Sequence, residues 1–155
     1  MKLRFIWIGK TKSAPIKELL GEYFDRIGKF AAVEVTELRD GNDSGAGAAR
    51  MIEKESEDIL SRTASIPFLV VLDERGHQID SMKLAELIEK HRLSGTKEMG
   101  FVIGGRNGLA DSVRERADYV LALSRMTFTH ELARVLLAEQ VYRAFAIIHD
   151  LPYQK

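Results

Sequence analysis

The sequence alternates short apolar segments with segments of helical periodicity, and this alternation repeats along the whole chain. Its clearest apolar segment is residues 67–73, PFLVVLD, a nearly continuous hydrophobic run that ends in an acid. Runs of this kind are typical of central parallel strands that are covered on both faces. The alternation therefore predicts an α/β fold with a mainly parallel sheet.

Five strands and five helices follow from the periodicity. Strands are expected at residues 3–8, 33–38, 67–73, 101–103 and 119–124. Helices are expected at residues 15–27, 51–60, 82–88, 110–117 and 130–149. A chain of 155 residues with no internal repeat and no long linker fits one domain, residues 1–155. Residues 40–49, DGNDSGAGAA, are rich in glycine and small polar side chains, which predicts a mobile loop.

Composition narrows the classes of function. The chain has 23 basic and 23 acidic residues, whereas a strongly electrostatic nucleic-acid binder is usually basic overall. Any RNA contact would use a local patch, and residues 1–30 carry seven basic and three acidic residues. The absence of cysteine excludes disulfides, thiolate catalysis and cysteine-ligated zinc, and no metal site is expected. No apolar segment approaches the ~20 residues that span a bilayer, and no signal peptide is recognised, so a cytoplasmic protein is expected.

The segment 101–110, FVIGGRNGLA, places three glycines directly after a strand. It matches the dinucleotide pattern G-x-G-x-x-G poorly, and the chain contains no Walker loop. Two interpretations remain: a tight connection from strand to helix, or a loop whose bare backbone lies against a ligand. Ligands of open α/β sheets bind beyond the carboxyl ends of the strands. The strand ends at residues 72–73, 104–105 and 123–124 are therefore the candidate site.

The last expected helix, residues 130–149, is apolar almost all round. Such a helix is buried on several sides. A partner subunit in a twofold dimer would cover the apolar surface that one chain leaves exposed. The alternative is that the helix is buried within one subunit. His130 and Arg134 are four residues apart and share a face. Glu139 and Arg143 have the same spacing with the acid first, which favours a structural ion pair. His130 either packs at the helix start or contacts a ligand.

Several segments resemble a known family: VLDERG, FVIGGRNGL, LALSRMTFTHELARVLLAEQVYRAFAI and the closing PY. They are similar to the RlmH family of large-subunit rRNA pseudouridine-N3 methyltransferases, a branch of the SPOUT methyltransferases. The similarity covers residues 1–155 and is most specific at residues 130–147. It implies a SPOUT-type parallel-sheet sandwich with a C-terminal trefoil knot, a feature that ordinary topology rules would reject. It also implies a homodimer through the last helix, S-adenosylmethionine as cofactor, and a pseudouridine of 23S rRNA in the assembled ribosome as substrate.

For catalysis the sequence itself offers four candidates near the expected pocket: His130, Arg134, Arg143 and Tyr153. Of these, Arg143 and Tyr153 are expected as the catalytic groups on the substrate side, and His130 as a positioning group.

The resemblance also assigns roles to residues. Gly104 and Gly105 would leave bare backbone against the cofactor, while Leu72, Met126 and Phe128 would flank its adenine. The full set implied for cofactor binding is Leu72, Gly104, Leu123, Ser124, Arg125, Met126, Thr127 and Phe128.

The chain departs from the family pattern at its end. Relatives often close in Pro-Tyr-His and a basic residue, whereas this sequence has Gln154, which cannot act as a base, after Tyr153. His149 is the alternative base. Residues 40–49 lack lysines, so Lys10 and Lys12 are the candidates for RNA contact. The alternative is that these two lysines belong to an ordinary solvated surface.

Other functions remain open on the sequence. One is a nucleotide-binding oxidoreductase, although the dinucleotide motif is missing near the start. Another is a non-catalytic dimeric protein that binds RNA or the ribosome, and a third is a SPOUT methyltransferase with a different target nucleotide.

Overall fold

The computed structural model describes residues 1–41 and 47–154. Half of the loop predicted to be mobile at residues 40–49, namely residues 42–46, lies outside the described residues. The strands are β1 (Lys2–Ile8), β2 (Ala32–Leu38), β3 (Phe68–Gln78), β4 (Glu98–Ile103) and β5 (Tyr119–Ala122). The helices are α1 (Ala14–Ile27), α2 (Ala48–Thr63), α3 (Ser81–Leu93), α4 (Asp111–Arg116) and α5 (His130–Ile148), followed by the short 3₁₀ helix η1 (Pro152–Gln154).

The strands form one five-stranded sheet in the order β2-β1-β4-β3-β5. Every neighbouring pair is parallel, which confirms the predicted parallel α/β fold. Because all strands run the same way, their carboxyl ends meet at one edge of the sheet. The ends of β3, β4 and β5 are adjacent there, since β3 lies between the other two.

Strand β3 is longer than the sequence predicted. Its pairing with β5 shifts register between Leu72 and His77, which both lie opposite Leu121. Residues 73–76 therefore form an insertion in the ladder, a kind of irregularity that is common beside active sites. Gly76 makes this insertion possible, because a Cβ atom there would lie 2.6 Å from the carbonyl oxygen of Val120.

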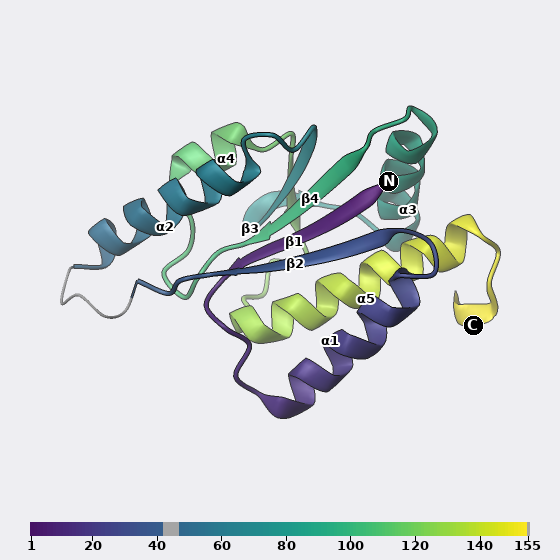
Figure 1. Ribbon diagram of the computed structural model, residues 1–155, viewed down its shortest axis with the longest axis horizontal. Coiled ribbons are helices and arrows are strands. Elements are labelled where there is room, and N and C mark those ends of the chain that lie inside the picture. Colours follow the sequence, from purple (N-terminus) through teal and green to yellow (C-terminus); the bar gives the residue numbers. More distant parts are fainter. Residues whose placement is uncertain (42–46, 155) are drawn as a thin grey trace.

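Helices cover both faces of the sheet (Figure 1), with α1, α3 and α5 on one face and α2 and α4 on the other. The alternation of side chains along β1 separates the two cores. Phe5 and Trp7 belong to the cluster that includes Phe145 of α5, whereas Ile6 and Ile8 belong to the cluster on the opposite face.

Helix α5 packs between α1 and α3 and against the sheet. Its residues Leu137, Ala138, Val141, Ala144 and Phe145 are fully buried within one chain. Burial inside the subunit therefore accounts for much of the apolar character of this helix. Apolar surface remains at its start, where Leu132 is 43% exposed. None of the described helices has the length and apolar composition needed to cross a membrane.

Candidate functional site

A cavity of about 700 Å³ opens at the carboxyl ends of β3, β4 and β5. Four segments form its walls: residues 72–75 of β3, the glycine loop (residues 104–108), the bend after β5 (residues 123–129) and the start of α5. This is the edge at which open α/β sheets bind ligands. The volume lies within the ~300–1,000 Å³ range of small-molecule and cofactor sites.

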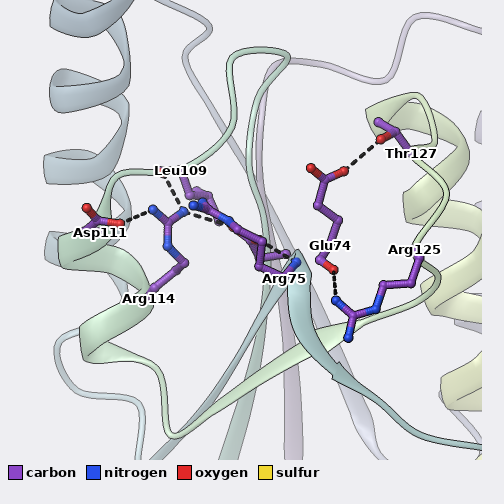
Figure 2. A network of polar contacts seen from close by, with 8 residues as sticks. Glu74, Arg75, Leu109, Asp111, Arg114, Arg125 and Thr127 are labelled. Atoms are coloured by element: carbon purple, nitrogen blue, oxygen red, sulfur yellow. Dashed lines mark hydrogen bonds and ion pairs between the residues drawn. The ribbon is translucent and has the colours of Figure 1, made fainter.

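Most of the residues that the sequence assigned to the cofactor lie on this cavity. Those that line it are Leu72, Gly104, Leu123, Ser124, Met126, Thr127 and Phe128. Arg125 does not line it: its Nη1 donates instead to the backbone carbonyl of Glu74 at 3.5 Å (Figure 2). The structure thus brings together segments that lie more than fifty residues apart in the chain, such as Leu72 and Thr127.

The glycine loop is crowded by atoms of the protein itself. A Cβ atom on Gly104 would lie 2.7 Å from Cγ of Leu109 and 3.1 Å from the carbonyl oxygen of Gly108. One on Gly105 would lie 3.0 Å from Oε2 of Glu55. Gly108 has a φ of 85°, and its N–H donates to the carbonyl of Gly105 at 3.0 Å. The glycines are therefore required by a tight turn and by close packing, and this turn also forms a wall of the cavity.

Asp73 connects the end of β3 to the far side of the glycine loop. Its carboxylate accepts from Nε of Arg75 at 3.1 Å and from Nη1 of Arg114 at 2.9 Å. Burial raises the pKa of Asp73, but hydrogen bonds from Arg75 and the charge of Arg114 outweigh it and hold the pKa below its ordinary value. Arg114 also donates to the carbonyl of Leu109 at 2.7 Å and pairs with Asp111 (Figure 2).

Glu74, the next residue, turns to the other side of β3. Its Oε2 accepts from the hydroxyl of Thr127 at 2.7 Å, which links β3 to the bend after β5 (Figure 2). The sequence analysis included Asp73 in the candidate site, at the strand end of residues 72–73, but it did not identify Glu74 or Arg114. The available signal was the pair of acids directly after a buried strand, which sits where ligands bind.

His130 lies at the start of α5 and lines the cavity. Thr129 caps this helix by accepting from the N–H of Leu132 at 3.4 Å. Glu131 does not line the cavity and accepts from the backbone N–H groups of Lys12 at 2.8 Å and Ser13 at 3.1 Å. The turn after β1 is therefore fixed beside the helix start that borders the cavity.

Arg134 also holds the turn after β1, through hydrogen bonds from its guanidinium. It is fully buried and donates to the hydroxyl of Thr11 at 2.8 Å and to the carbonyls of Ile8 at 2.7 Å and Gly9 at 3.1 Å. Its guanidinium lies 4.9 Å from the centre of the Trp7 ring. Although His130 and Arg134 are one helical turn apart, the first faces the cavity and the second the interior.

Arg143 and Tyr153 do not line the cavity. They meet in a separate group, here called the tail cluster: Tyr23, Glu139, Arg143 and Tyr153. Arg143 donates to Oε1 of Glu139 at 2.6 Å, which confirms the predicted ion pair, and Tyr153 donates to the same oxygen at 3.2 Å. At about 1.5 Å per residue, Arg143 lies about 20 Å along α5 from His130. One chain therefore does not bring these predicted catalytic residues together.

The tail cluster is electrostatically coupled. Burial raises the pKa of Tyr153, and its contacts with Tyr23 and Glu139 raise it further, so this phenol stays protonated at neutral pH. The hydrogen bond that Arg143 donates to Glu139 raises the pKa of Arg143. His149, the alternative base, stacks on Phe30 with ring centres 4.8 Å apart and lies outside the cavity lining. Among the described residues, no group of histidine and acidic side chains is arranged to hold a metal ion.

Comparison with known proteins gives full-length matches. The model of a family described as "Predicted SPOUT methyltransferase" matches residues 1–154. A protein of Trichlorobacter lovleyi named ribosomal RNA large subunit methyltransferase H is 48% identical over 153 residues, which are 99% of this chain and 99% of that protein. A protein of the same name from Geobacter sulfurreducens is 44% identical over 153 residues, again 99% of both chains.

Solved structures share the fold. A probable methylase family protein from Haemophilus influenzae superposes with a TM-score of 0.60 at 14% identity, covering 99% of this chain and 70% of that one. A probable methyltransferase from Bordetella pertussis superposes with a TM-score of 0.58 at 16% identity, covering 92% of this chain and 95% of that one.

Proposed function

Because the chain belongs to the SPOUT methyltransferase family, we propose that it methylates ribosomal RNA of the large subunit with S-adenosylmethionine as methyl donor. The observation that carries this proposal is the 48% identity, over 99% of both chains, to a protein named for that activity. The specific reaction that we propose is methylation at N3 of a pseudouridine in 23S rRNA, on the assembled ribosome. The resemblance of residues 71–76, 101–109 and 121–147 supports this choice.

The cavity fits the proposed cofactor. Its apolar wall contains Leu72, Leu121 and Phe128, which suits the adenine ring, and its polar wall contains the backbone of the glycine loop. Met126 is 74% exposed and borders the cavity where it opens to solvent. We assign the adenine to Leu72 and Phe128, with Met126 covering the opening.

Methyl transfer depends on the alignment of the reacting atoms more than on covalent catalysis by the protein. S-adenosylmethionine supplies a methyl group that is activated by its positive sulfur, and transfer is an in-line displacement. The protein gains most of the rate by holding the acceptor nitrogen on that line. The acceptor is an imide nitrogen, which must lose its proton, and a cationic group nearby favours the deprotonated form.

Arg143 and Tyr153 suit the acceptor side of this reaction. Arg143 carries a permanent charge that stabilises an imidate, and Tyr153, with its raised pKa, serves as a hydrogen-bond donor and not as a base. His130 lines the cavity, and we assign to it the orientation of the acceptor. The distance of about 20 Å between His130 and Arg143 along α5 means that the two act together only across two subunits.

We therefore propose a twofold dimer in which two copies of α5 pair in opposite directions. Such pairing places the tail cluster of one subunit beside the cavity of its partner, and it covers the exposed Leu132 at the helix start. As the resemblance implies, we also propose that the C-terminal segment forms a trefoil knot. The exposed Lys10 and Lys12, on the turn that Glu131 and Arg134 fix beside the cavity, are the proposed RNA contacts.

The activity is tested on ribosomes. Ribosomes from cells with and without the protein are compared by mass spectrometry of 23S rRNA digests, and a methylated pseudouridine is expected only with the protein. Ribosomes that lack the mark are then incubated with purified protein and labelled S-adenosylmethionine. Identical digests from the two strains would contradict the proposed target, and no label transfer to any rRNA would contradict the activity itself.

The shared site is tested by mixing two inactive variants. Gly104→Val removes the cofactor cavity and Arg143→Ala removes the substrate-side cation. In each mixed dimer one of the two sites combines an intact cavity with an intact Arg143. Because random pairing of equal amounts makes about half of the dimers mixed, the mixture should regain about one quarter of the wild-type activity. A mixture that forms mixed dimers, as mass spectrometry of intact complexes would show, but stays inactive would mean that each site belongs to one chain.

A further inference from the structure

We propose that Glu74 is a positioning residue for the cofactor: its hydrogen bond with Thr127 holds the bend of residues 123–129 over the cavity. This inference rests on the proposed function, because it takes the cavity to be the S-adenosylmethionine site. Glu74 acts through Thr127 and makes no contact with the reacting atoms in this assignment.

The insertion in β3 explains why a side-chain contact is needed here. Between Leu72 and His77 the strand leaves its ladder with β5, so residues 73–76 lack regular cross-strand hydrogen bonds to hold the two segments together. Asp73, Glu74 and Arg75 all lie in this insertion and all line the cavity. The side chains of Asp73 and Glu74 join this part of β3 to the neighbouring walls.

The two acids of the insertion join different walls. Figure 2 shows Glu74 bonded to Thr127 on one side and Arg114 bonded to Leu109 on the other. Asp73, with a side chain only 9% exposed, binds Arg114, which in turn holds the carbonyl of Leu109 at the end of the glycine loop. That connection is shielded from water and multiply bonded, so it fixes the wall permanently. The side chain of Glu74 joins the opposite wall through the 2.7 Å hydrogen bond from Thr127.

The exposure of Glu74 and Thr127 sets the strength of their hydrogen bond. Both side chains are open to solvent, so water can replace either partner, and the net stabilisation is modest. A contact of this kind can open to admit a ligand and close again behind it. The backbone carbonyl of Glu74 also accepts from Arg125, so the same residue holds the bend at two neighbouring positions.

Removal of the contact should weaken cofactor binding mainly by faster release. Glu74→Ala and Thr127→Val are each expected to bind S-adenosylmethionine about 3- to 10-fold more weakly, measured by calorimetry, with a matching rise in dissociation rate in stopped-flow experiments. The KM for the cofactor should rise with little change in kcat, because the contact closes the site without touching the reacting atoms. Glu74→Gln and Thr127→Ser, which keep an acceptor and a hydroxyl, should lose less than Glu74→Ala and Thr127→Val.

The double variant separates an indirect role from a direct one. If Glu74 acts through Thr127, Glu74→Ala should weaken binding no further in a Thr127→Val protein. Glu86→Ala is the matched control, since it removes an exposed 2.8 Å contact with Lys83 on α3, away from the cavity. Melting temperatures of all variants exclude loss of fold as the cause.

The outcomes are distinguishable. Wild-type protein that fails to bind S-adenosylmethionine would overturn the proposed function, and this inference with it. Wild-type binding together with an unchanged affinity in Glu74→Ala, or additive losses in the double variant, would overturn the role of Glu74 alone.

Discussion

Replacement of Gly104 by alanine tests why the glycine loop has its composition. The added Cβ would lie 2.7 Å from Cγ and 3.0 Å from Cδ2 of Leu109, whereas carbon atoms pack at about 3.5–4.0 Å. Cγ is the branch point of leucine, so rotation of its terminal methyl groups does not relieve the overlap. The carbonyl of Gly108, 3.1 Å away, is main chain and blocks the other direction.

The expected cost is that of overpacking a core, about 1–3 kcal/mol. For a chain of this size about 1 kcal/mol lowers Tm by about 2–4 °C, so Gly104→Ala should melt several degrees below wild type at equal protein concentration. Cofactor affinity should also fall, because Leu109 and Gly108 line the cavity and must move. Gly21→Ala is the control: nothing lies within 4 Å of its Cβ position in α1, so alanine should stabilise the helix by about 0.5–1 kcal/mol.

A second substitution, Leu109→Ala, tests whether the leucine side chain causes the destabilisation by Gly104→Ala. In a Leu109→Ala protein the overlap with the leucine side chain is gone, so Gly104→Ala should cost at least about 0.5 kcal/mol less than in the wild type. An equal cost in both backgrounds would refute the packing argument. So would an unchanged Tm with cofactor binding abolished, since the space at Gly104 would then be reserved for the ligand alone.

Three further substitutions test other parts of the structure. Arg134→Met should destabilise the protein by about 1–3 kcal/mol in urea unfolding, because it leaves buried carbonyls unpaired, whereas Arg92→Met in an exposed ion pair should cost at most about 0.5 kcal/mol. Burial raises the pKa of Glu55 above its ordinary 4.5, so the folded state binds the proton of Glu55 more tightly than the unfolded state does. The wild type should therefore lose stability relative to Glu55→Gln as the pH rises from 4.5 through that raised pKa. A Tm difference that stays constant with pH would contradict this. Lys12→Glu should raise the KM for ribosomes and lower the salt dependence of binding by about one unit of slope, with Lys54→Glu on α2 as the neutral control.

The order of the elements was predictable because it depends on local pattern. The apolar run of residues 67–73 and the helical spacing of residues 15–27 each determine their element without distant contacts. The predicted end of the third strand, at residue 73, was wrong because the following residues, Glu74, Arg75 and Gly76, have the composition of a loop. The strand resumes beyond them only because β5 pairs with it again after the insertion. No periodicity within one segment carries that information.

The location of the site was predictable from the strand ends at residues 72–73, 104–105 and 123–124, whereas most of its individual cofactor residues came from the resemblance. Sequence spacing placed His130 and Arg134 on one face, but the burial of Arg134 depends on Thr11, which lies 123 residues away in the chain. The bridge from Asp73 through Arg114 to Leu109 depends equally on tertiary contacts. The separation of Arg143 from the cavity follows from the length of α5 and becomes visible only once the cavity is located at the start of that helix.

The start of α5 joins the two surfaces that an RNA methyltransferase needs. His130 and Ala133 form a wall of the cavity, while Glu131 and Arg134, in the same turn of helix, hold the segment that carries Lys10 and Lys12. Because Arg134 is buried and bonded to the backbone at Ile8 and Gly9, this segment moves only if the end of β1 or the helix moves as well. An RNA phosphate bound by Lys12 would therefore be held at a fixed distance from the cavity, and the target base would be placed by the rigid scaffold, with no adjustment of a flexible loop.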